Sequence, residues 1–485
     1  MKKLRQKVYR DFSKGNWNYI QNIMAPENST RLSLNLDSDV ELGSLISRKG
    51  TTLIGTQLVD TKSCYGLHNF RYTQGAGFDK IFASFPDSGG ANNDIYDVIS
   101  GTKSLEDDTV NYKTRFLTYL DSMLRLNGVD GPKAFNGSSW VTTGGTFDLG
   151  NLPSGSKYAI EFKDRVYVAG SSANPDRVDI SSIASSTSRS VDWTSDDAKF
   201  IVFEQEDGGG GITGLEKVPD YVLVFKKRTL KRYNGSTAFP EDMINQGAPS
   251  QEAIITSKGM CFWVNENGCW ATTGGIPKKI SSYTVDNIIK SCSALNLLEV
   301  CAGEDGEHVY WSFPSVTIDR VVYTNVVLKY NILLNSWDVR QYSPLIKCFT
   351  RYVDVNGTIF TIFGDDDGNV QKFDIGTTDN GVSITYSMET QDLDFGLRMF
   401  KKGINRMGVL TENISKGTLM WRNSHNPEDW KAIGTIRKEI EEFAGLDLRG
   451  NFVQFKISET TSTGQAKILG LEFPEGAVGI YDNVE

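Results

Sequence analysis

The chain has 485 residues, of which 39% are hydrophobic and 23% charged, and its formal net charge is −9. This much apolar material excludes a chain that is disordered throughout, and the length exceeds what one ordinary hydrophobic core holds, so we expect at least two domains. The acidic balance argues against a protein that binds nucleic acid through a basic face, although it is compatible with a wall past which DNA moves without sticking.

The N-terminus is basic and leads into polar sequence instead of the apolar stretch of a secretory signal. Its five cationic side chains are Lys2, Lys3, Arg5, Lys7 and Arg10. Two interpretations fit them: a solvated tail, or an ordered arm that docks on an acidic neighbouring subunit. The sequence also contains no run of roughly 20 apolar residues, so it predicts a soluble protein, made in the cytosol, without a membrane span.

From about residue 41 to residue 378, short runs of alternating apolar and polar residues are separated by tight turns. Asn-Gly and Asp-Gly pairs, the strongest short hairpin signals, occur at 267–268, 305–306 and 356–357. Multi-stranded units recur every roughly 40–60 residues, which is typical of propeller blades. We therefore predict an all-β fold with an irregular β-propeller of about five to seven blades. A row of stacked β-sandwiches is the alternative.

Two segments also have helical features. Residues 112–126 are long enough for a helix, but their Thr and aromatic content and the turn that follows at 127–128 fit a strand pair equally well. Residues 282–298 have the apolar spacing of a short helix, with a loop between strands as the alternative.

The strands become longer after a polar break at residues 376–381. They span about one hundred residues, the size of a β-sandwich. We place a domain boundary near Asp379. The predicted organisation is an N-terminal arm with the first strands at residues 1–40, a β-propeller at 41–378 and a β-sandwich at 379–485.

No group of residues in the sequence predicts a cofactor or a metal. The six cysteines and three histidines form neither a CxxC pair nor a His cluster, so we expect reduced thiols and no zinc site. The Gly-rich stretch Asp207–Gly211 lacks the Lys-Ser/Thr of a P-loop and predicts a flexible loop. Asp365–Asn369 lacks the spacing of an EF-hand, which favours a tight turn whose carboxylates bind their own backbone, with a structural calcium ion as the alternative.

Catalytic motifs are equally absent. Propellers host glycosidases, which need a pair of carboxylates. The Ser-x-Asp-x-Gly-x-Thr-Trp box of sialidases does not occur, nor does Gly-x-Ser-x-Gly or His-Glu-x-x-His. We predict a protein that is not an enzyme. A carbohydrate-binding or glycan-cleaving propeller of a host-recognition device is the alternative.

A series of short motifs follows the order found in one protein family. The motifs are GSLISRKG at 43–50, DRVYVAG at 164–170, NPDR at 174–177, DGGGGITGL at 207–215, LVFK at 223–226, NSW at 335–337, GDDDGNV at 364–370, LDFG at 393–396, LRG at 448–450 and LGL at 469–471. Each is weak alone, and their common order along most of the chain is the specific part. The sequence resembles the tail-hub, or nozzle, proteins of short-tailed bacteriophages, also called DNA-stabilisation or head-completion proteins.

This resemblance implies a structural virion protein that is assembled in the host cytoplasm into the phage tail. Such hubs form a ring, commonly a hexamer, below the portal and its adaptor ring. They continue the DNA channel, retain the packaged genome and dock a tail needle, spikes or fibres. The implied partners are copies of the chain itself, adaptor or head-to-tail connector proteins, needle, spike or fibre proteins, and DNA that passes without sequence-specific binding.

The resemblance also suggests roles for two segments. The loop of Asp207, Gly208, Gly209, Gly210 and Gly211 would line or close the bore of the ring, and the basic N-terminal residues would dock on a neighbouring subunit.

Overall fold

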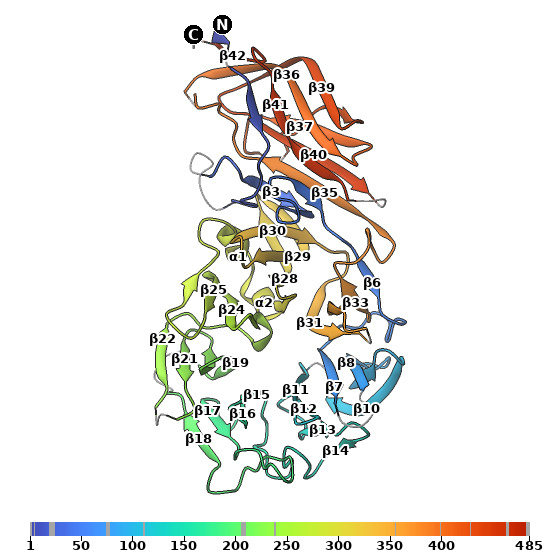
Figure 1. Ribbon diagram of the computed structural model, residues 1–485, viewed down its shortest axis with the longest axis vertical. Helices are drawn as coiled ribbons and strands as arrows, with labels where there is room; N and C mark the ends of the chain where they lie inside the picture. The colour runs from blue at the N-terminus through green and yellow to red at the C-terminus, as the bar shows by residue number, and fades with distance from the viewer. Residues whose placement is uncertain are drawn as a thin grey trace.

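The computed structural model describes residues 2–3, 5–18, 25–73, 78–109, 112–204, 210–236, 239–354, 356–397, 399–426, 428–461 and 465–481. Figure 1 shows an elongated molecule with a ring of small sheets at one end and two packed sheets at the other, where both termini lie. Strands dominate, and the helices of the described residues are short. The predicted all-β fold, a β-propeller followed by a β-sandwich, is confirmed.

In the part of the chain that the structure describes, the propeller has seven antiparallel blades of four strands each. Blades 1 to 3 comprise β7 (Gly66–Tyr72), β8 (Phe78–Pro86), β9 (Asn92–Asp97) and β10 (Thr102–Thr109); β11 (Arg115–Tyr119), β12 (Ser122–Leu126), β13 (Lys133–Phe135) and β14 (Trp140–Val141); and β15 (Tyr158–Phe162), β16 (Arg165–Ala169), β17 (Arg177–Ile180) and β18 (Lys199–Val202).

Blades 4 to 7 follow the same plan, except that the fourth strand of blade 7 comes from the N-terminal part of the chain. They comprise β19 (Ile212–Val218), β20 (Tyr221–Lys226), β21 (Leu230–Tyr233) and β22 (Glu241–Ile244); β23 (Ile254–Ser257), β24 (Met260–Asn265), β25 (Gly268–Thr272) and β26 (Lys278–Lys279); β27 (Cys301–Glu304), β28 (His308–Ile318), β29 (Val321–Asn331) and β30 (Ser336–Gln341); and β31 (Ile346–Val353), β32 (Ile359–Asp365), β33 (Val370–Phe373) and β6 (Thr51–Leu53).

Strand β6 closes the ring. It pairs antiparallel with β33, with Thr52 opposite Lys372, so the outer strand of the last blade precedes the first blade in the sequence. The first strands of successive blades contact one another around the circle, and β31 of blade 7 contacts β7 of blade 1. A closed ring of blades leaves only short strand edges exposed, which limits wrong pairing with other chains.

A glycine at the turn of blade 7 lets the closing segment approach. Gly368 has a φ of +80°, and a Cβ atom added to it would lie 1.4 Å from the carbonyl oxygen of Val59. The backbone N–H of Leu58, in the same segment, donates to the carbonyl of Gly368 at 3.0 Å. Only glycine fits this contact between the turn at 364–370 and the chain that leads from β6 to blade 1.

The sandwich consists of two sheets that share one core. The first sheet contains β1 (Lys2–Lys3), β42 (Val478–Tyr481), β36 (Lys401–Glu412), β41 (Lys467–Phe473), β5 (Leu45–Ser47) and β4 (Leu36–Asp37), with β2 (Lys7–Tyr9) on β41 and β39 (Ile440–Gly450) on β36. The second contains β3 (Thr30–Leu34), β35 (Val382–Thr390), β40 (Gln454–Thr461), β37 (Gly417–Arg422) and β38 (Lys431–Ile436). Strand β3 also pairs with β30 of blade 6, so this sheet is continuous with the propeller.

The predicted division of the N-terminal part is wrong. Residues 1–40 do not form a separate region, because β1, β2 and β4 complete the first sheet of the sandwich. The propeller begins at β6 and not at residue 41, since β5 is still a sandwich strand. At the other boundary the chain passes into the sandwich through β34 (Thr378–Asp379), close to the predicted position.

The two ambiguous segments are resolved by the structure. Residues 112–126 contain the strand pair β11–β12, which turns at Leu120 and Asp121, both with positive φ. Residues 282–298 contain two short helices, α1 (Asp286–Lys290) and α2 (Ala294–Leu298), that pack against β28.

Candidate functional site: the propeller mouth and the domain junction

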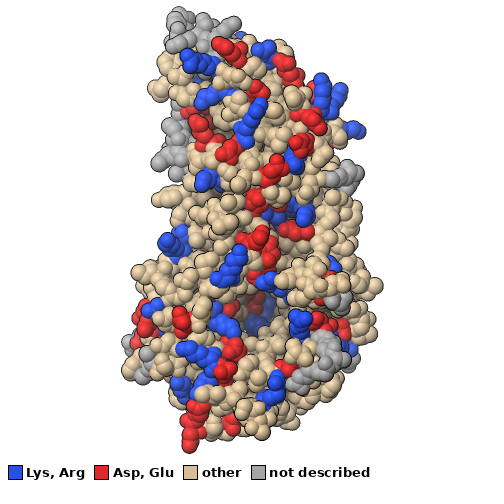
Figure 2. Space-filling view, viewed as in Figure 1, with Lys and Arg blue, Asp and Glu red and all other residues tan. Residues whose placement is uncertain are grey.

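A cavity of about 300 Å³ lies at the centre of the propeller, and residues from the first strand of every blade line it. Figure 2 shows it as a hollow in the ring, with charged side chains on its walls. Four of its charged side chains lie at or just before the beginnings of first strands: Lys113 and Arg115 at β11, Glu252 at β23 and Lys347 at β31. Glu299, just before β27, pairs with the two lysines. We call these five residues the mouth cluster.

Ion pairs connect the mouth cluster across blades. The guanidinium of Arg115 donates from Nε to Glu252 at 2.8 Å and lies 4.8 Å from the centre of the Tyr158 ring. The ammonium of Lys347 donates to Glu299 at 2.6 Å. Lys113 lies 3.9 Å from the same Glu299 carboxylate, and its ammonium has no hydrogen-bond partner among the described residues.

The surroundings shift the pKa values of these groups. Burial opposes the charge of Glu252, but Arg115 and Lys113 prevail and hold the pKa of this carboxyl below its usual value. Burial likewise opposes the charge of Lys113, and the carboxylates of Glu252 and Glu299 raise its pKa. For both Glu252 and Lys113, the opposite charges nearby therefore favour the ionised form.

One further carboxyl lines the cavity in a different environment. Burial raises the pKa of Glu216, on β19, although the backbone N–H of Lys217 donates to its carboxylate at 2.9 Å. The cavity thus contains one carboxyl that retains its proton to higher pH, Glu216, and one that stays ionised, Glu252. Acid–base catalysis by two carboxyls requires surroundings that give them different pKa values, so that one carries a proton while the other is ionised.

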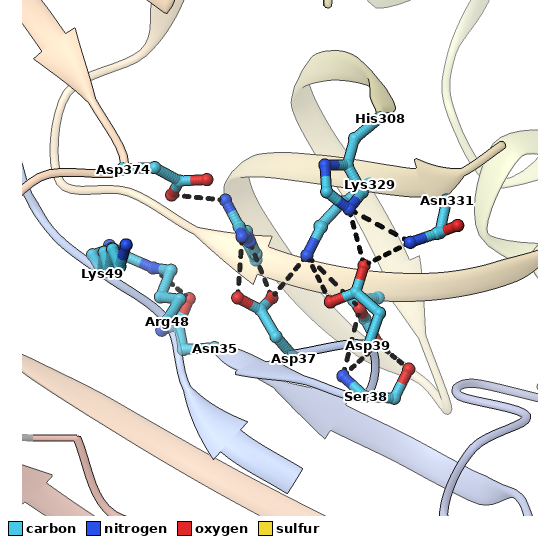
Figure 3. A network of polar contacts seen from close by, with 12 residues as sticks. Asn35, Asp37, Ser38, Asp39, Arg48, Lys49, His308, Lys329, Asn331 and Asp374 are labelled. Atoms are coloured by element: carbon cyan, nitrogen blue, oxygen red, sulfur yellow. Dashed lines mark hydrogen bonds and ion pairs between the residues drawn. The ribbon is translucent and has the colours of Figure 1, made fainter. Parts of the chain in front are cut away.

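A second group of buried charges lies where the N-terminal segment crosses from the sandwich to blade 6. Figure 3 shows Asp37, Ser38 and Asp39 of this segment facing side chains of the propeller. We call this group the junction network; its members are Asp37, Ser38, Asp39, Asp305, His308, Lys329, Asn331, Asp338, Arg340 and Asp374.

Arg340 is the centre of one half of the junction network. Its guanidinium binds both carboxylate oxygens of Asp37, at 2.8 and 2.9 Å, and one oxygen of Asp374 at 2.7 Å. Both Arg340 and Asp37 are buried, with side chains 2% and 5% exposed. Burial opposes ionisation of Asp37, but Arg340 and Lys329 lower its pKa. A planar guanidinium suits such a two-oxygen contact, which fixes β4 against β30.

Asp39 is the centre of the other half. One of its oxygens lies 2.7 Å from Lys329 Nζ, and the other lies 2.7 Å from His308 Nε2. The Nδ1 atom of His308 lies 2.8 Å from Asp305. Burial alone would lower the pKa of His308, but the two carboxylates, Asp305 and Asp39, raise it to about 9. His308 is consequently a cation at neutral pH, unlike an unperturbed histidine.

Asp338 behaves differently from its neighbours. Burial raises its pKa to about 7, although Lys329 acts in the opposite direction, and its carboxylate accepts a hydrogen bond from the Ser38 hydroxyl at 2.8 Å. A second buried pair, Arg48 and Asp379 at 2.6 Å, extends the contact between the N-terminal segment and the start of the sandwich. These contacts fix the two domains to each other.

The residues of the predicted channel loop lie on the connection between blades 3 and 4. Asp207, Gly208 and Gly209 are outside the described residues. Gly210 has a φ of +72°, and Gly211, next to Pro175, leads into β19. The structure therefore places the described end of this loop on the strand that carries Glu216.

The predicted docking arm lies at the opposite end of the molecule (Figure 1). Lys2 and Lys3 form β1 and pair with β42, and Lys7 is in β2, which pairs with β41. Arg10 lies 3.3 Å from Glu472 of β41, and Arg5 is exposed. These residues do not form a free tail, because Lys2, Lys3 and Lys7 lie in strands of the first sheet of the sandwich. Docking on a neighbouring subunit stays a prediction.

Three of the motifs that carry the family resemblance make contacts that stabilise the blades. Asp176 of NPDR and Lys226 of LVFK form an ion pair of 2.9 Å between blades 3 and 4, with side chains 8% and 1% exposed. In GDDDGNV, the carboxylate of Asp365 accepts from the backbone N–H groups of Asp367 and Asn369, at 2.9 and 2.8 Å. The predicted tight turn, with a carboxylate bound to its own backbone, is present.

Sequence reasoning did not find the mouth cluster or the junction network. The available signal was a charged residue inside an otherwise apolar run, such as Lys329 in VVLKY. Such residues are buried only with partners, and the partners here lie about 300 positions away in the sequence.

Among the described residues, no group of three or more His, Cys, Asp or Glu side chains is arranged to hold a metal ion. No helix in the described ranges has the length and apolar character needed to cross a bilayer.

Comparisons with known proteins give structural likenesses only. No family model and no curated protein matches the chain. Similar solved structures include the extracellular domain of BT4673 from B. thetaiotaomicron, at 10% identity and a TM-score of 0.43, covering 90% of this chain and 61% of that one. Others are BBS1N in complex with ARL6DN (11%, TM-score 0.42, 67% and 97% covered) and Saccharomyces cerevisiae Sqt1 (10%, TM-score 0.39, 67% and 99% covered). The chain spans about three-fifths of the first of these.

Proposed function

We propose that this chain is a structural subunit of a bacteriophage tail, the hub or nozzle ring below the portal and its adaptor. In this role it continues the DNA channel, retains the packaged genome and docks a needle, spikes or fibres. The ring consists of several copies, six by analogy with the family that the sequence resembles. The observation that carries the proposal is the collinear series of family motifs along most of the chain.

The positions of these motifs support a structural role. NPDR and LVFK contribute the two members of the buried Asp176–Lys226 ion pair. GDDDGNV contains Gly368, against which the closing segment packs. Both contacts hold neighbouring parts of the propeller in place.

The surface charge supports a wall that does not bind DNA. Acidic and basic side chains are interspersed over the face shown in Figure 2, without a basic stripe. A protein that held DNA by its phosphates would need a concentration of Lys and Arg on one face. The net charge of −9 also argues against binding to the negatively charged DNA backbone.

The test is a mass measurement and negative-stain microscopy of the full-length protein, alone and mixed with its adaptor protein. We expect ring-shaped particles with several copies of the chain, formed by the protein itself or on the adaptor ring. As a control, the adaptor alone should give no particle of this mass. A chain that stays monomeric in the presence of the adaptor would contradict the proposal.

A glycan-binding or glycan-cleaving propeller is the second candidate, and one observation favours it. Glu216 and Glu252 line the same cavity, and their surroundings shift the two pKa values in opposite directions. If they cleave glycosidic bonds, the purified chain releases sugar from host polysaccharide, and Glu216→Gln abolishes the release while Glu475→Gln, outside the cavity, does not. If the chain is a tail hub instead, we expect the wild-type protein to release no sugar.

A further inference from the structure

Two thiols meet at the seam of the propeller. Cys64 lies on the segment that connects β6, the closing strand of blade 7, to β7, the first strand of blade 1. Cys348 lies on β31, the first strand of blade 7. Their sulfur atoms are 3.1 Å apart, about 1 Å more than the roughly 2.05 Å of a disulfide bond.

The backbone around the pair holds both cysteines in place. The N–H of Cys64 donates to the carbonyl of Asp365 at 2.9 Å, which fixes the segment against blade 7. Gly364 makes room for the two side chains: a Cβ atom added to it would lie 2.4 Å from the sulfur of Cys64 and 3.0 Å from that of Cys348. The family-like motif at 364–370 thus also provides the space in which the two sulfur atoms meet.

The two thiols differ in access. Cys64 is fully buried, whereas Cys348 is half-buried and lines the 300 Å³ central cavity. A small molecule that enters the mouth of the propeller reaches Cys348 first. Cys301 lines the same cavity, but its thiol donates to the carbonyl of Ile346 at 3.4 Å.

We propose that Cys64 and Cys348 are a redox modification site, a thiol pair that small-molecule disulfides oxidise to an intramolecular disulfide bond across the propeller seam. The structure shows the reduced form, with both thiols free. In the oxidised form, the closing segment and the first strand of blade 7 are covalently joined.

The reaction is two successive thiol–disulfide exchanges. The Cys348 thiol loses its proton to solvent, and the thiolate attacks one sulfur of the disulfide R–S–S–R. The Cys348–S–S–R bond forms, and the R–S⁻ that leaves takes up a proton. Cys64, whose pKa burial raises, then attacks the sulfur of Cys348 and gives its proton to the departing R–S⁻, so that the Cys64–Cys348 bond forms and R–SH leaves. One small disulfide is reduced to two thiols, and two protein thiols are oxidised.

The bond would add a covalent link at the seam, where blade 7 meets blade 1. Without it, the seam is held by the pairing of β6 with β33, by backbone hydrogen bonds between the closing segment and the turn at 364–370, and by the contact of β31 with β7. A covalent link between residues 64 and 348 restricts the unfolded chain over a very long loop, which favours the folded state. Reducing cytosol keeps such thiols free, and an oxidising exterior permits the bond, so the seam would become covalent after the protein leaves the cell.

Trypsin digestion and mass spectrometry test the proposal directly. Incubation of the native full-length protein with oxidised glutathione, followed by alkylation and trypsin without reductant, should produce one linked species, residues 63–71 joined to 348–351. The other cysteines fall on different tryptic peptides, 259–278 and 291–320, so the linked species is unambiguous. We expect two titratable thiols to be lost and the midpoint of thermal unfolding to rise by several degrees, both reversed by dithiothreitol.

Two variants complete the test. Cys348→Ser should abolish the linked species and the oxidant-dependent rise in the unfolding midpoint. Cys301→Ser, at the same cavity, should retain both. The proposal is overturned if oxidised wild-type protein carries glutathione on Cys348 without the linked peptide, or if both thiols remain free. It is also overturned if Cys301→Ser loses the linked species.

Discussion

Replacing Arg340 by alanine is expected to lower the free energy of unfolding by about 3–5 kcal/mol. The substitution leaves the carboxylate of Asp37 without its two guanidinium hydrogen bonds in a site where the Asp37 side chain is 5% exposed. It also removes the partner of Asp374 and the cation that lies 5.6 Å from the Tyr310 and Phe373 rings. Urea denaturation followed by tryptophan fluorescence measures the change.

An exposed pair provides the matched control. Arg449 and Asp447 lie 2.6 Å apart with side chains 52% and 71% exposed, so Arg449→Ala should change the free energy of unfolding by about 0.5 kcal/mol or less. A double variant, Asp37→Leu with Arg340→Met, should recover much of the loss, because it removes both charges instead of stranding one. If Arg340→Ala costs no more than Arg449→Ala, the junction network does not join the domains.

The stability of the protein is expected to fall by about 2 kcal/mol as the pH rises from 7 to 9, because of His308. Burial lowers the pKa of this side chain, but Asp305 and Asp39 outweigh it, and the folded-state pKa is about 9. The value in the unfolded chain is about 6.5. Folding therefore favours the protonated imidazole; the stabilisation is complete below about pH 6.5 and is lost as the pH rises through 9. Urea midpoints at several pH values measure it.

The same junction contains other titrating groups, and they act in other pH ranges. The pKa of Asp338, raised to about 7 chiefly by burial, changes stability mainly below pH 7. The lowered pKa values of Asp39 and Asp305, whose carboxylates receive hydrogen bonds from His308 against the effect of burial, matter only in acid. A His308→Gln variant should therefore lose the decline between pH 7 and 9. An unchanged slope in this variant would contradict the assignment.

Local sequence determined the elements of this fold. Hairpins form where Asn-Gly and Asp-Gly pairs interrupt alternating runs, as in the β24–β25 turn before Gly268, because turn residues and side-chain alternation act over a few positions. For the same reason the all-β class, the propeller followed by a sandwich and the turn at Asp365 could be predicted. For residues 282–298 the apolar spacing indicated a short helix, with a loop as the alternative, and two short helices lie there.

Only the tertiary structure decided how the two ends of the chain are used. The closing strand β6 and the sandwich strands β1 to β5 depend on pairing between residues hundreds of positions apart, for which local patterns carry no information. The charged sites follow the same rule. Lys329 could be recognised as a charge inside an apolar run, but the burial of Lys329 and Arg340 is possible only because folding brings Asp37 and Asp39 to them, and a buried charge is stable only beside its partner.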